Sequence, residues 1–143
     1  AGSVLFLIAE YIAKQIPEKQ EITIKRGLMV GLFQCLALIP GMSRSGATIS
    51  GGLILGLSRE QAARFAFLLS FPIILGAGTL KAIDLGSAGI LLDQSGVLII
   101  SFLAAFLSGV AAIHYLLKFL RNHTLLVFVV YRVLLAGVVL WVV

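Results

Sequence analysis

Residues 27–57 read GLMVGLFQCLALIPGMSRSGATISGGLILGL, and this stretch decides the fold that we expect. It holds two apolar segments, 27–39 and 47–57, joined by a polar sequence that begins with Pro40 and Gly41. Each segment is well short of the roughly 20 residues that a helix needs to span the hydrocarbon core of a bilayer. Two half-length segments joined by a polar turn are typical of a re-entrant helical hairpin, which enters a membrane and returns to the same side. One broken spanning helix is the alternative interpretation.

The composition of the chain predicts that this hairpin lies in a membrane. Of the 143 residues, 60% are hydrophobic and only 12% are charged, which excludes a disordered chain and argues against a soluble enzyme. Three longer apolar runs are predicted spanning helices: 61–83, 96–117 and 125–143. Ser58 and Gln61, at the start of the first run, have the spacing of a capping box. We therefore predict one all-α domain over residues 1–143, a polytopic integral membrane helical bundle.

The basic residues predict the orientation of the bundle. If the hairpin returns to its own side, three loops share one face of the membrane: 14–26, 58–64 and 118–123. They hold eight of the eleven Lys and Arg residues. The opposite loop has one basic residue, Lys81, and two acidic residues, Asp84 and Asp93. Because cytoplasmic loops are rich in Lys and Arg, the basic face is predicted to be cytoplasmic, with the C-terminus outside. A broken spanning helix would divide these loops between both faces, so the hairpin is favoured.

The net charge of +5 has two possible partners, nucleic acid and lipid headgroups. The basic residues fall mainly between apolar runs, which is the usual position of the flanks of transmembrane helices. We therefore expect the membrane, and no nucleic acid, as the partner of this charge.

The segment 40–48, PGMSRSGAT, carries the predicted chemistry, because it places Arg44 at the predicted tip of the hairpin. An arginine at membrane depth is costly unless it meets an anion or a carboxylate. Hydroxyl residues and glycines surround it: Ser43, Ser45, Thr48, Gly41 and Gly46. The second half-helix is expected to begin just after Arg44, so that its free N–H groups and positive dipole end point to the same place. These features predict an anion site, in which the planar guanidinium binds two phosphate oxygens.

A simpler interpretation is that Ser43 or Ser45 only caps the helix and that Arg44 extends to a lipid headgroup. Two further polar residues are candidates for substrate binding. Gln34 lies in the first arm of the hairpin, where it binds substrate or bridges the two arms. Arg132 lies inside the last apolar run and is predicted to point inward to a partner, because intramembrane arginines usually do so.

The stretch 31–77 resembles the second conserved region of undecaprenyl-diphosphate phosphatase, the bacitracin-resistance family of integral membrane phosphatases. The family signature PGxSRSGAT is present as PGMSRSGAT at 40–48, and AFLLSFP at 66–72 resembles the segment that follows it. The similarity continues to Tyr131 and Arg132 and so covers nearly the whole chain.

The resemblance implies hydrolysis of undecaprenyl diphosphate to the monophosphate in the bacterial inner membrane, which recycles the lipid carrier of cell-wall synthesis. It implies that Arg44 binds the diphosphate and stabilises charge as the bridging bond breaks. Ser43 and Ser45 are then catalytic neighbours of the phosphates, and Thr48 binds substrate beside them. A divalent cation, Mg²⁺ or Ca²⁺, is also implied by the resemblance.

The chain departs from the family pattern in one respect. The family has an N-terminal half, related to this one as an inverted repeat, with a Glu-rich motif, a Ser–Ser pair and a His that this sequence lacks. The six acidic residues lie outside the signature and form no convincing metal-ligand set or general base: Glu10, Glu18, Glu21, Glu60, Asp84 and Asp93. Since the chain opens on Ala1 inside an apolar run, we expect it to be a piece of a longer or processed protein.

We therefore predict the C-terminal half of such an enzyme, which needs a complementary N-terminal half or, less completely, a second copy of itself. A transporter or flippase of a polyprenyl phosphate is the alternative function, because transporters also hold anions at half-helix N-termini in mid-membrane. A structural scaffold subunit is a third interpretation, and it leaves Arg44 and its hydroxyl neighbours unexplained.

Overall fold

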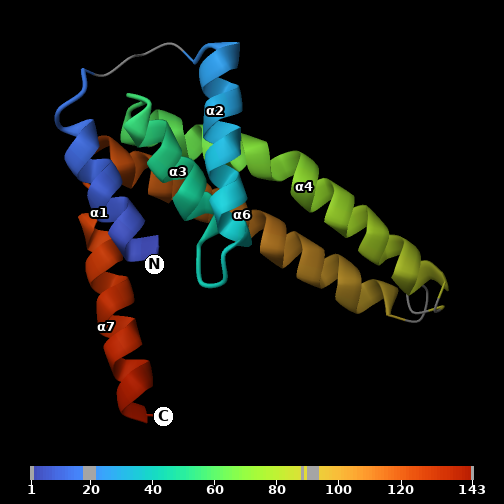
Figure 1. Ribbon diagram of the computed structural model, residues 1–143. Helices are drawn as coiled ribbons and strands as arrows, with labels where there is room; N and C mark the ends of the chain where they lie inside the picture. Colours follow the sequence, from blue (N-terminus) through green and yellow to red (C-terminus); the bar gives the residue numbers. More distant parts are fainter. Residues whose placement is uncertain (1, 18–21, 88, 90–93, 143) are drawn as a thin grey trace.

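The computed structural model describes residues 2–17, 22–87, 89 and 94–142, and every element within these ranges is a helix (Figure 1). In chain order the elements are α1 (Gly2–Ala13), α2 (Ile24–Gln34), the 3₁₀ helix η1 (Cys35–Leu38), α3 (Arg44–Ile54), α4 (Arg59–Ser87), α6 (Ser95–Asn122) and α7 (Leu126–Val142). The all-α prediction is confirmed. Four charged residues of the sequence analysis lie outside the described residues: Glu18, Lys19, Glu21 and Asp93.

Helices α2 and α3 form a helical hairpin (Figure 1). Each has 11 residues, and at about 1.5 Å per residue this gives a length near half of the ~30 Å hydrocarbon core. Gly41 makes the turn between them with a φ of +83°, in the left-handed region that favours glycine. The second arm begins at Arg44, close to the expected start just after this arginine, because Ser43 caps the helix.

Helix α3 lies at the centre of the molecule, in contact with α1, α2 and α4. Two glycines permit its close approach to the neighbours. A Cβ atom on Gly51 would lie 2.5 Å from the Phe33 side chain of α2, and one on Gly52 would lie 2.7 Å from the Ala62 Cβ of α4. The residues of α3 from Gly46 to Leu53 are accordingly all buried.

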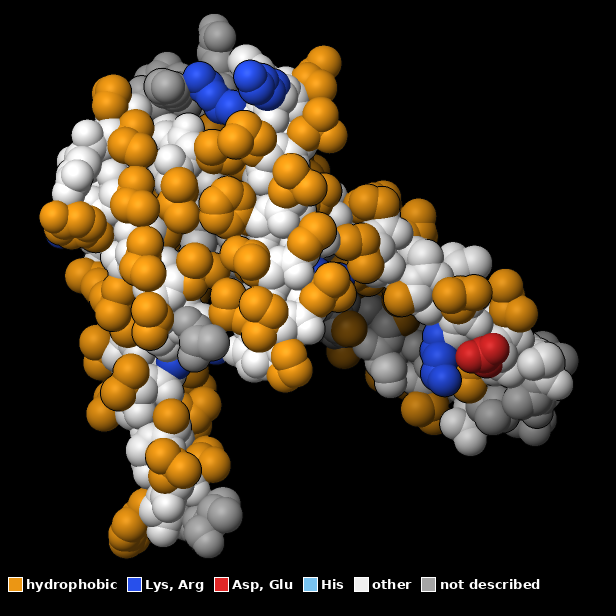
Figure 2. Space-filling model, viewed as in Figure 1, with side chains coloured by type: hydrophobic (Ala, Val, Ile, Leu, Met, Phe, Trp, Pro, Cys, Tyr) orange, Lys and Arg blue, Asp and Glu red, His pale blue; other side chains and the backbone are white. Residues whose placement is uncertain are grey.

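Helices α4 and α6 are long and apolar enough to cross a membrane. They have 29 and 28 residues, and only 6% and 0% of their most apolar 18-residue stretches are buried. A core helix of a soluble protein would be mostly buried, whereas here exposed apolar side chains are spread over the whole face seen in Figure 2. The capping box at the start of α4 is confirmed: Ser58 N donates to Gln61 Oε1 and Gln61 N donates to Ser58 Oγ, both at 3.2 Å.

Both long helices extend beyond their predicted ends. Helix α4 continues to Ser87, so Asp84 is helical rather than in a loop. Its Oδ2 atom lies 3.9 Å from Nζ of Lys81, which is one helical turn earlier. Helix α6 continues to Asn122, so the predicted basic turn 118–123 is mostly its last turn. An ion pair between Arg121 and Glu60 of α4 stabilises that turn. Helix α7 has 17 residues, at the lower limit for a spanning helix.

A buried carboxylate joins α1, α4 and the start of α7. Glu10 of α1 is 3% exposed. Arg59 Nη2 and Nε donate to its two oxygens at 2.7 and 2.9 Å, and the backbone N–H of Leu125 donates to Oε1 at 2.9 Å. These bonds bring the end of α1, the start of α4 and the α6–α7 connection to one end of the bundle, away from the turn of the hairpin (Figure 1). The predicted orientation requires the loops 14–26, 58–64 and 118–123 to lie on one side of the membrane, and this arrangement is compatible with it.

Candidate functional site

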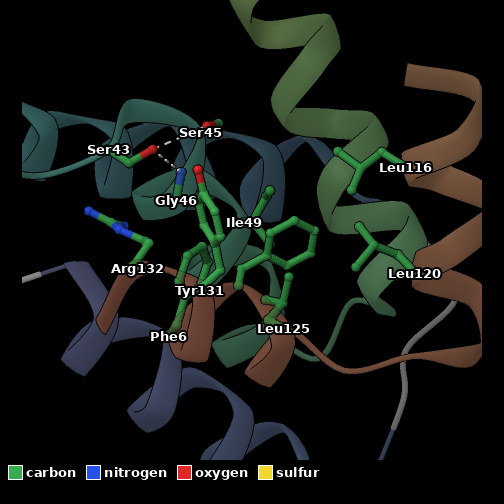
Figure 3. Close-up of a pocket in the computed structure, with 11 residues that line it drawn as sticks. Phe6, Ser43, Ser45, Gly46, Ile49, Leu116, Leu120, Leu125, Tyr131 and Arg132 are labelled. Atoms are coloured by element: carbon green, nitrogen blue, oxygen red, sulfur yellow. Dashed lines mark hydrogen bonds between the residues drawn. The ribbon is translucent and has the colours of Figure 1, made fainter. Parts of the chain in front are cut away.

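A cavity of about 430 Å³ lies beside the turn of the hairpin, between α3, α1, α6 and α7. We call it the tip cavity. The residues that line it are Phe6, Ser43, Ser45, Gly46, Ile49, Leu116, Leu120, Leu125, Phe128, Tyr131 and Arg132. Figure 3 shows Ser43, Ser45 and Arg132 at one end of the cavity and Leu116 and Leu120 at the other. The tip cavity is therefore amphiphilic, with a polar end at the start of α3 and an apolar end against α6.

The polar end is built by the first turn of α3. Ser43 Oγ accepts a hydrogen bond from Gly46 N at 3.2 Å and lies 3.3 Å from Ser45 Oγ. Ser43 is thus the helix cap of the simpler interpretation, and it also lines the cavity. Because the Gly46 amide is used by this cap, the amides of Arg44 and Ser45 are the first-turn donors that the described hydrogen bonds leave for a ligand.

Gly46 has a role different from the predicted one. Glycines permit unusual backbone angles, but Gly46 is helical, and of the two signature glycines Gly41 has a positive φ. A Cβ atom on Gly46 would lie 3.1 Å from Ser43 Cβ and 3.3 Å from the Phe6 ring. A side chain at position 46 would therefore require Ser43 and the Phe6 ring of α1 to move by a few tenths of an ångström.

Arg132 supplies the positive charge of the tip cavity. It is half-buried on α7, and its guanidinium lies against α1, where a Cβ atom on Gly2 would be 2.8 Å from Nη1. Over the part of the chain that the structure describes, this guanidinium has no hydrogen-bond or ion-pair partner. Arg132 lines the tip cavity together with Ser43 and Ser45, and no carboxylate of the described residues pairs with it.

Arg44 and Thr48 lie on a different face of α3. Thr48 is buried, with its Oγ1 2.9 Å from the carbonyl oxygen of Arg44 and 3.3 Å from Gln34 Oε1 of α2. Gln34 therefore bridges the two arms of the hairpin, one of the two roles left open for it. Neither Thr48 nor Gln34 lines the tip cavity.

The Arg44 side chain is half-buried at the turn of the hairpin. Its guanidinium has no ion-pair or hydrogen-bond partner among the described residues, and it does not line the tip cavity. Arg44 and Arg132 therefore leave two unpaired guanidinium groups near the start of α3. The structure brings Ser43, Ser45 and Gly46 together with Arg132, but not with the Arg44 side chain.

Comparison with known proteins identifies the family of this chain. Residues 1–138 match the model of the family described as Bacitracin resistance protein BacA. This chain belongs to that family. An undecaprenyl-diphosphatase of Mycolicibacterium smegmatis is 49% identical over 140 residues, which are 96% of this chain and 51% of the relative. An undecaprenyl-diphosphatase of Corynebacterium efficiens is 44% identical over 143 residues, and one of Synechococcus elongatus is 45% identical over 137.

The chain spans about half the length of the curated relatives that it matches. The match covers 97% of this chain and 49% of the Corynebacterium protein. For the Synechococcus protein it covers 96% of this chain and 48% of the relative. The resemblance to the bacitracin-resistance family, drawn from the signature at 40–48, is confirmed.

Sequence reasoning missed part of the site of this BacA-family chain. Phe6, Leu120 and Phe128 form apolar walls of the tip cavity, and no local motif marks them. Glu10 was also passed over, although an acidic residue inside the apolar run of α1 is a signal for a buried partner. The structure shows that partner to be Arg59.

The acidic residues do not provide a cation site within the described residues. Those residues contain no group of three His, Cys, Asp or Glu side chains that could hold a metal ion. Glu10 and Glu60 are bound by arginines, and Asp84 lies near Lys81 on the far part of α4. The polar end of the tip cavity offers hydroxyls and a guanidinium, which do not fit the carboxylate-rich coordination that Mg²⁺ or Ca²⁺ prefers.

Proposed function

We propose that this chain is the C-terminal half of an undecaprenyl-diphosphate phosphatase. In this proposal it takes part in the hydrolysis of undecaprenyl diphosphate to undecaprenyl phosphate and phosphate, which recycles the lipid carrier for cell-wall synthesis. The observation that carries the proposal is the tip cavity, which joins a cation and hydroxyls to an apolar wall. The printed name of the relatives, undecaprenyl-diphosphatase, supports the same reaction.

The two ends of the tip cavity suit the two parts of a polyprenyl diphosphate. The diphosphate would lie at Ser43, Ser45 and Arg132, and the first isoprene units would lie against Phe6 and Phe128. A volume of about 430 Å³ is typical of a small-molecule site. It suits the head of the lipid, while the rest of the chain would stay in the bilayer.

Phosphoryl transfer depends mostly on positioning and on neutralising the charge of the phosphate oxygens. Arg132 would neutralise charge from α7. Arg44, whose side chain lies outside the tip cavity, would have to turn toward the start of α3 to bind two oxygens of the diphosphate through its planar fork. Ser43 and Ser45 would donate hydrogen bonds, and the free amides at the start of α3 would add their partial positive charge. Gly41 makes the turn that presents this segment.

The remaining parts of the site would come from a complementary half. Since the described residues do not fit a divalent cation, we assign the ligands of the expected Mg²⁺ or Ca²⁺ and the proton acceptor to an N-terminal half, in a longer chain or a separate partner. A second copy of this chain is the alternative partner. When bound, the divalent cation would neutralise negative charge on the phosphate oxygens of the substrate.

The proposal includes a position in the membrane. We place the α2–α3 hairpin as a re-entrant element, half of an inverted-repeat fold, in a multi-pass protein of the bacterial inner membrane. Three observations support this: the short arms of the hairpin, the exposed apolar surfaces of α4 and α6, and the common end of the basic loops.

Phosphate release from undecaprenyl diphosphate, in detergent with Mg²⁺, tests the reaction. We expect release only when the chain is combined with the N-terminal half of a relative, and a loss of about 100-fold in Arg44→Ala. Lys81→Ala, on the far part of α4, is the matched control and should keep full activity. Lipid binding that depends on Arg44 without hydrolysis in any combination would contradict the phosphatase and favour a transporter or flippase.

A further inference from the structure

A second hollow, of about 320 Å³, lies between α4 and α6 at the end of the bundle that carries the basic loops. Its lining residues are Glu60 and Arg64 of α4 and His114, Leu117, Lys118 and Arg121 of α6. We call it the α4–α6 groove. It shares no lining residue with the tip cavity, so it is a separate site.

The α4–α6 groove has more positive charge than its own ion pairs use. Arg121 binds the Glu60 carboxylate with two hydrogen bonds, of 2.8 and 2.9 Å, and Arg64 Nη2 lies 3.7 Å from the same carboxylate. Lys118 has no ion-pair partner within the described ranges. One carboxylate thus faces three cations, which leaves two positive charges without a counter-ion in this part of the structure.

The cations are free to reach a ligand. The side chains of Arg64 and Arg121 are 63% and 60% exposed, and Lys118 is exposed beside them. One arginine paired with Glu60 would be enough to join α4 to α6, and the groove has two further cations. The second guanidinium and the ammonium remain available to an anion.

The charged groove continues into an apolar surface on both helices. On α4, Leu68, Phe71 and Leu75 follow Arg64 at the spacing of one helical face, and their exposed fractions are 65%, 67% and 58%. On α6, Val110, Leu107 and Leu103 precede His114 at the same spacing, and all are exposed. A shallow hollow beside Phe71 and Leu75 extends this surface. The site therefore pairs an anion-binding head with a long apolar stripe.

We propose that the α4–α6 groove binds an acidic phospholipid of the surrounding bilayer. Its phosphodiester would lie between Lys118, Arg64 and Arg121, and its acyl chains would lie along the exposed stripes of α4 and α6. Basic pockets between helices at the cytoplasmic side of a membrane bind such headgroups, because their cations match the phosphate charge. A free phosphate would use the same cations but not the stripes. The inference rests on the membrane position proposed above and is independent of the hydrolysis.

The test is a lipid-retention measurement on the full chain in detergent. The chain is mixed with equal amounts of phosphatidylglycerol and phosphatidylcholine, separated by gel filtration, and its bound lipid is measured by mass spectrometry. We expect phosphatidylglycerol to be enriched, and Lys118→Gln and Arg64→Gln each to reduce its retention about fivefold. Lys118→Arg should keep the retention. Lys81→Gln, an exposed cation of α4 outside the groove, is the matched control and should also keep it.

Three results would overturn the inference. Equal retention of the two lipids would exclude selection by charge, and an equal loss in Lys81→Gln would show a general surface effect. Displacement of phosphatidylglycerol by an excess of inorganic phosphate would indicate a free-anion site without a role for the stripes. An unchanged thermal midpoint shows that each variant is folded. Because no hydrolysis is measured, failure of the phosphatase proposal leaves this result unaffected.

Discussion

The Arg59 guanidinium donates two hydrogen bonds to the Glu10 carboxylate, at 2.7 and 2.9 Å, and this pair joins α1 to the start of α4. The same carboxylate accepts the backbone N–H of Leu125, just before α7. Since α1 and α7 supply Phe6 and Arg132 to the tip cavity, one buried ion pair positions two of its walls.

This pair predicts a stability effect. Glu10→Ala should lower the free energy of unfolding by about 3 kcal/mol, because it removes the buried carboxylate that binds the Arg59 guanidinium and accepts the Leu125 N–H. Thermal unfolding in detergent measures it. Glu60→Ala is the control and should lower the unfolding midpoint clearly less, since the Glu60 pair with Arg121 is open to solvent. Equal losses in the two variants would contradict a structural role for Glu10.

The unpaired guanidinium of Arg132 predicts an effect on activity. With the complementary half present, Arg132→Ala should lower kcat/KM at least about tenfold, because one charged hydrogen-bonded contact to phosphate is lost. Arg132→Lys should recover only part of this, since an ammonium cannot bind two oxygens in a fork. Full activity in Arg132→Ala would remove Arg132 from the substrate site.

A substitution at Thr48 tests whether this residue supports the hairpin or binds substrate. Thr48→Val keeps the shape of the side chain but removes the hydroxyl that lies near Gln34 and the Arg44 carbonyl. We expect a loss of about 1 kcal/mol of stability with KM unchanged, because Thr48 does not line the tip cavity. Thermal unfolding and steady-state kinetics on the same variant check both. A raised KM at unchanged stability would instead make Thr48 a substrate-binding residue.

The close approach of α3 to α2 predicts a difference between two glycines of the hairpin. Gly51→Ala places a methyl group 2.5 Å from the Phe33 side chain, so we expect a loss of about 1–3 kcal/mol of stability from overpacking. Gly31→Ala is the matched substitution on α2. A Cβ atom there has no neighbour within 4 Å among the described residues, so this variant should be neutral or more stable, as helix propensity favours alanine. The reverse order of the two midpoints would contradict the packing.

The sequence by itself determined the elements and the family. Apolar runs, the capping box at Ser58 and the signature at 40–48 are local patterns, so the helices, their approximate bounds and the membership of the BacA family followed from them. Arg132 could be singled out because a charge inside an apolar run is costly wherever the chain folds.

The tertiary structure decided which of these residues meet. Arg132 lies 87 positions beyond Ser45, and only the packing of α7 against α1, and of α1 against α3, brings its guanidinium and the Ser45 hydroxyl into one cavity. The packing of α2 against α3 turned Thr48 and Gln34 toward each other, and the approach of α1 to the start of α4 paired Glu10 with Arg59 across 49 residues. The physical reason is that helical periodicity shows which residues share a face, whereas the partner of that face depends on contacts between helices distant in sequence.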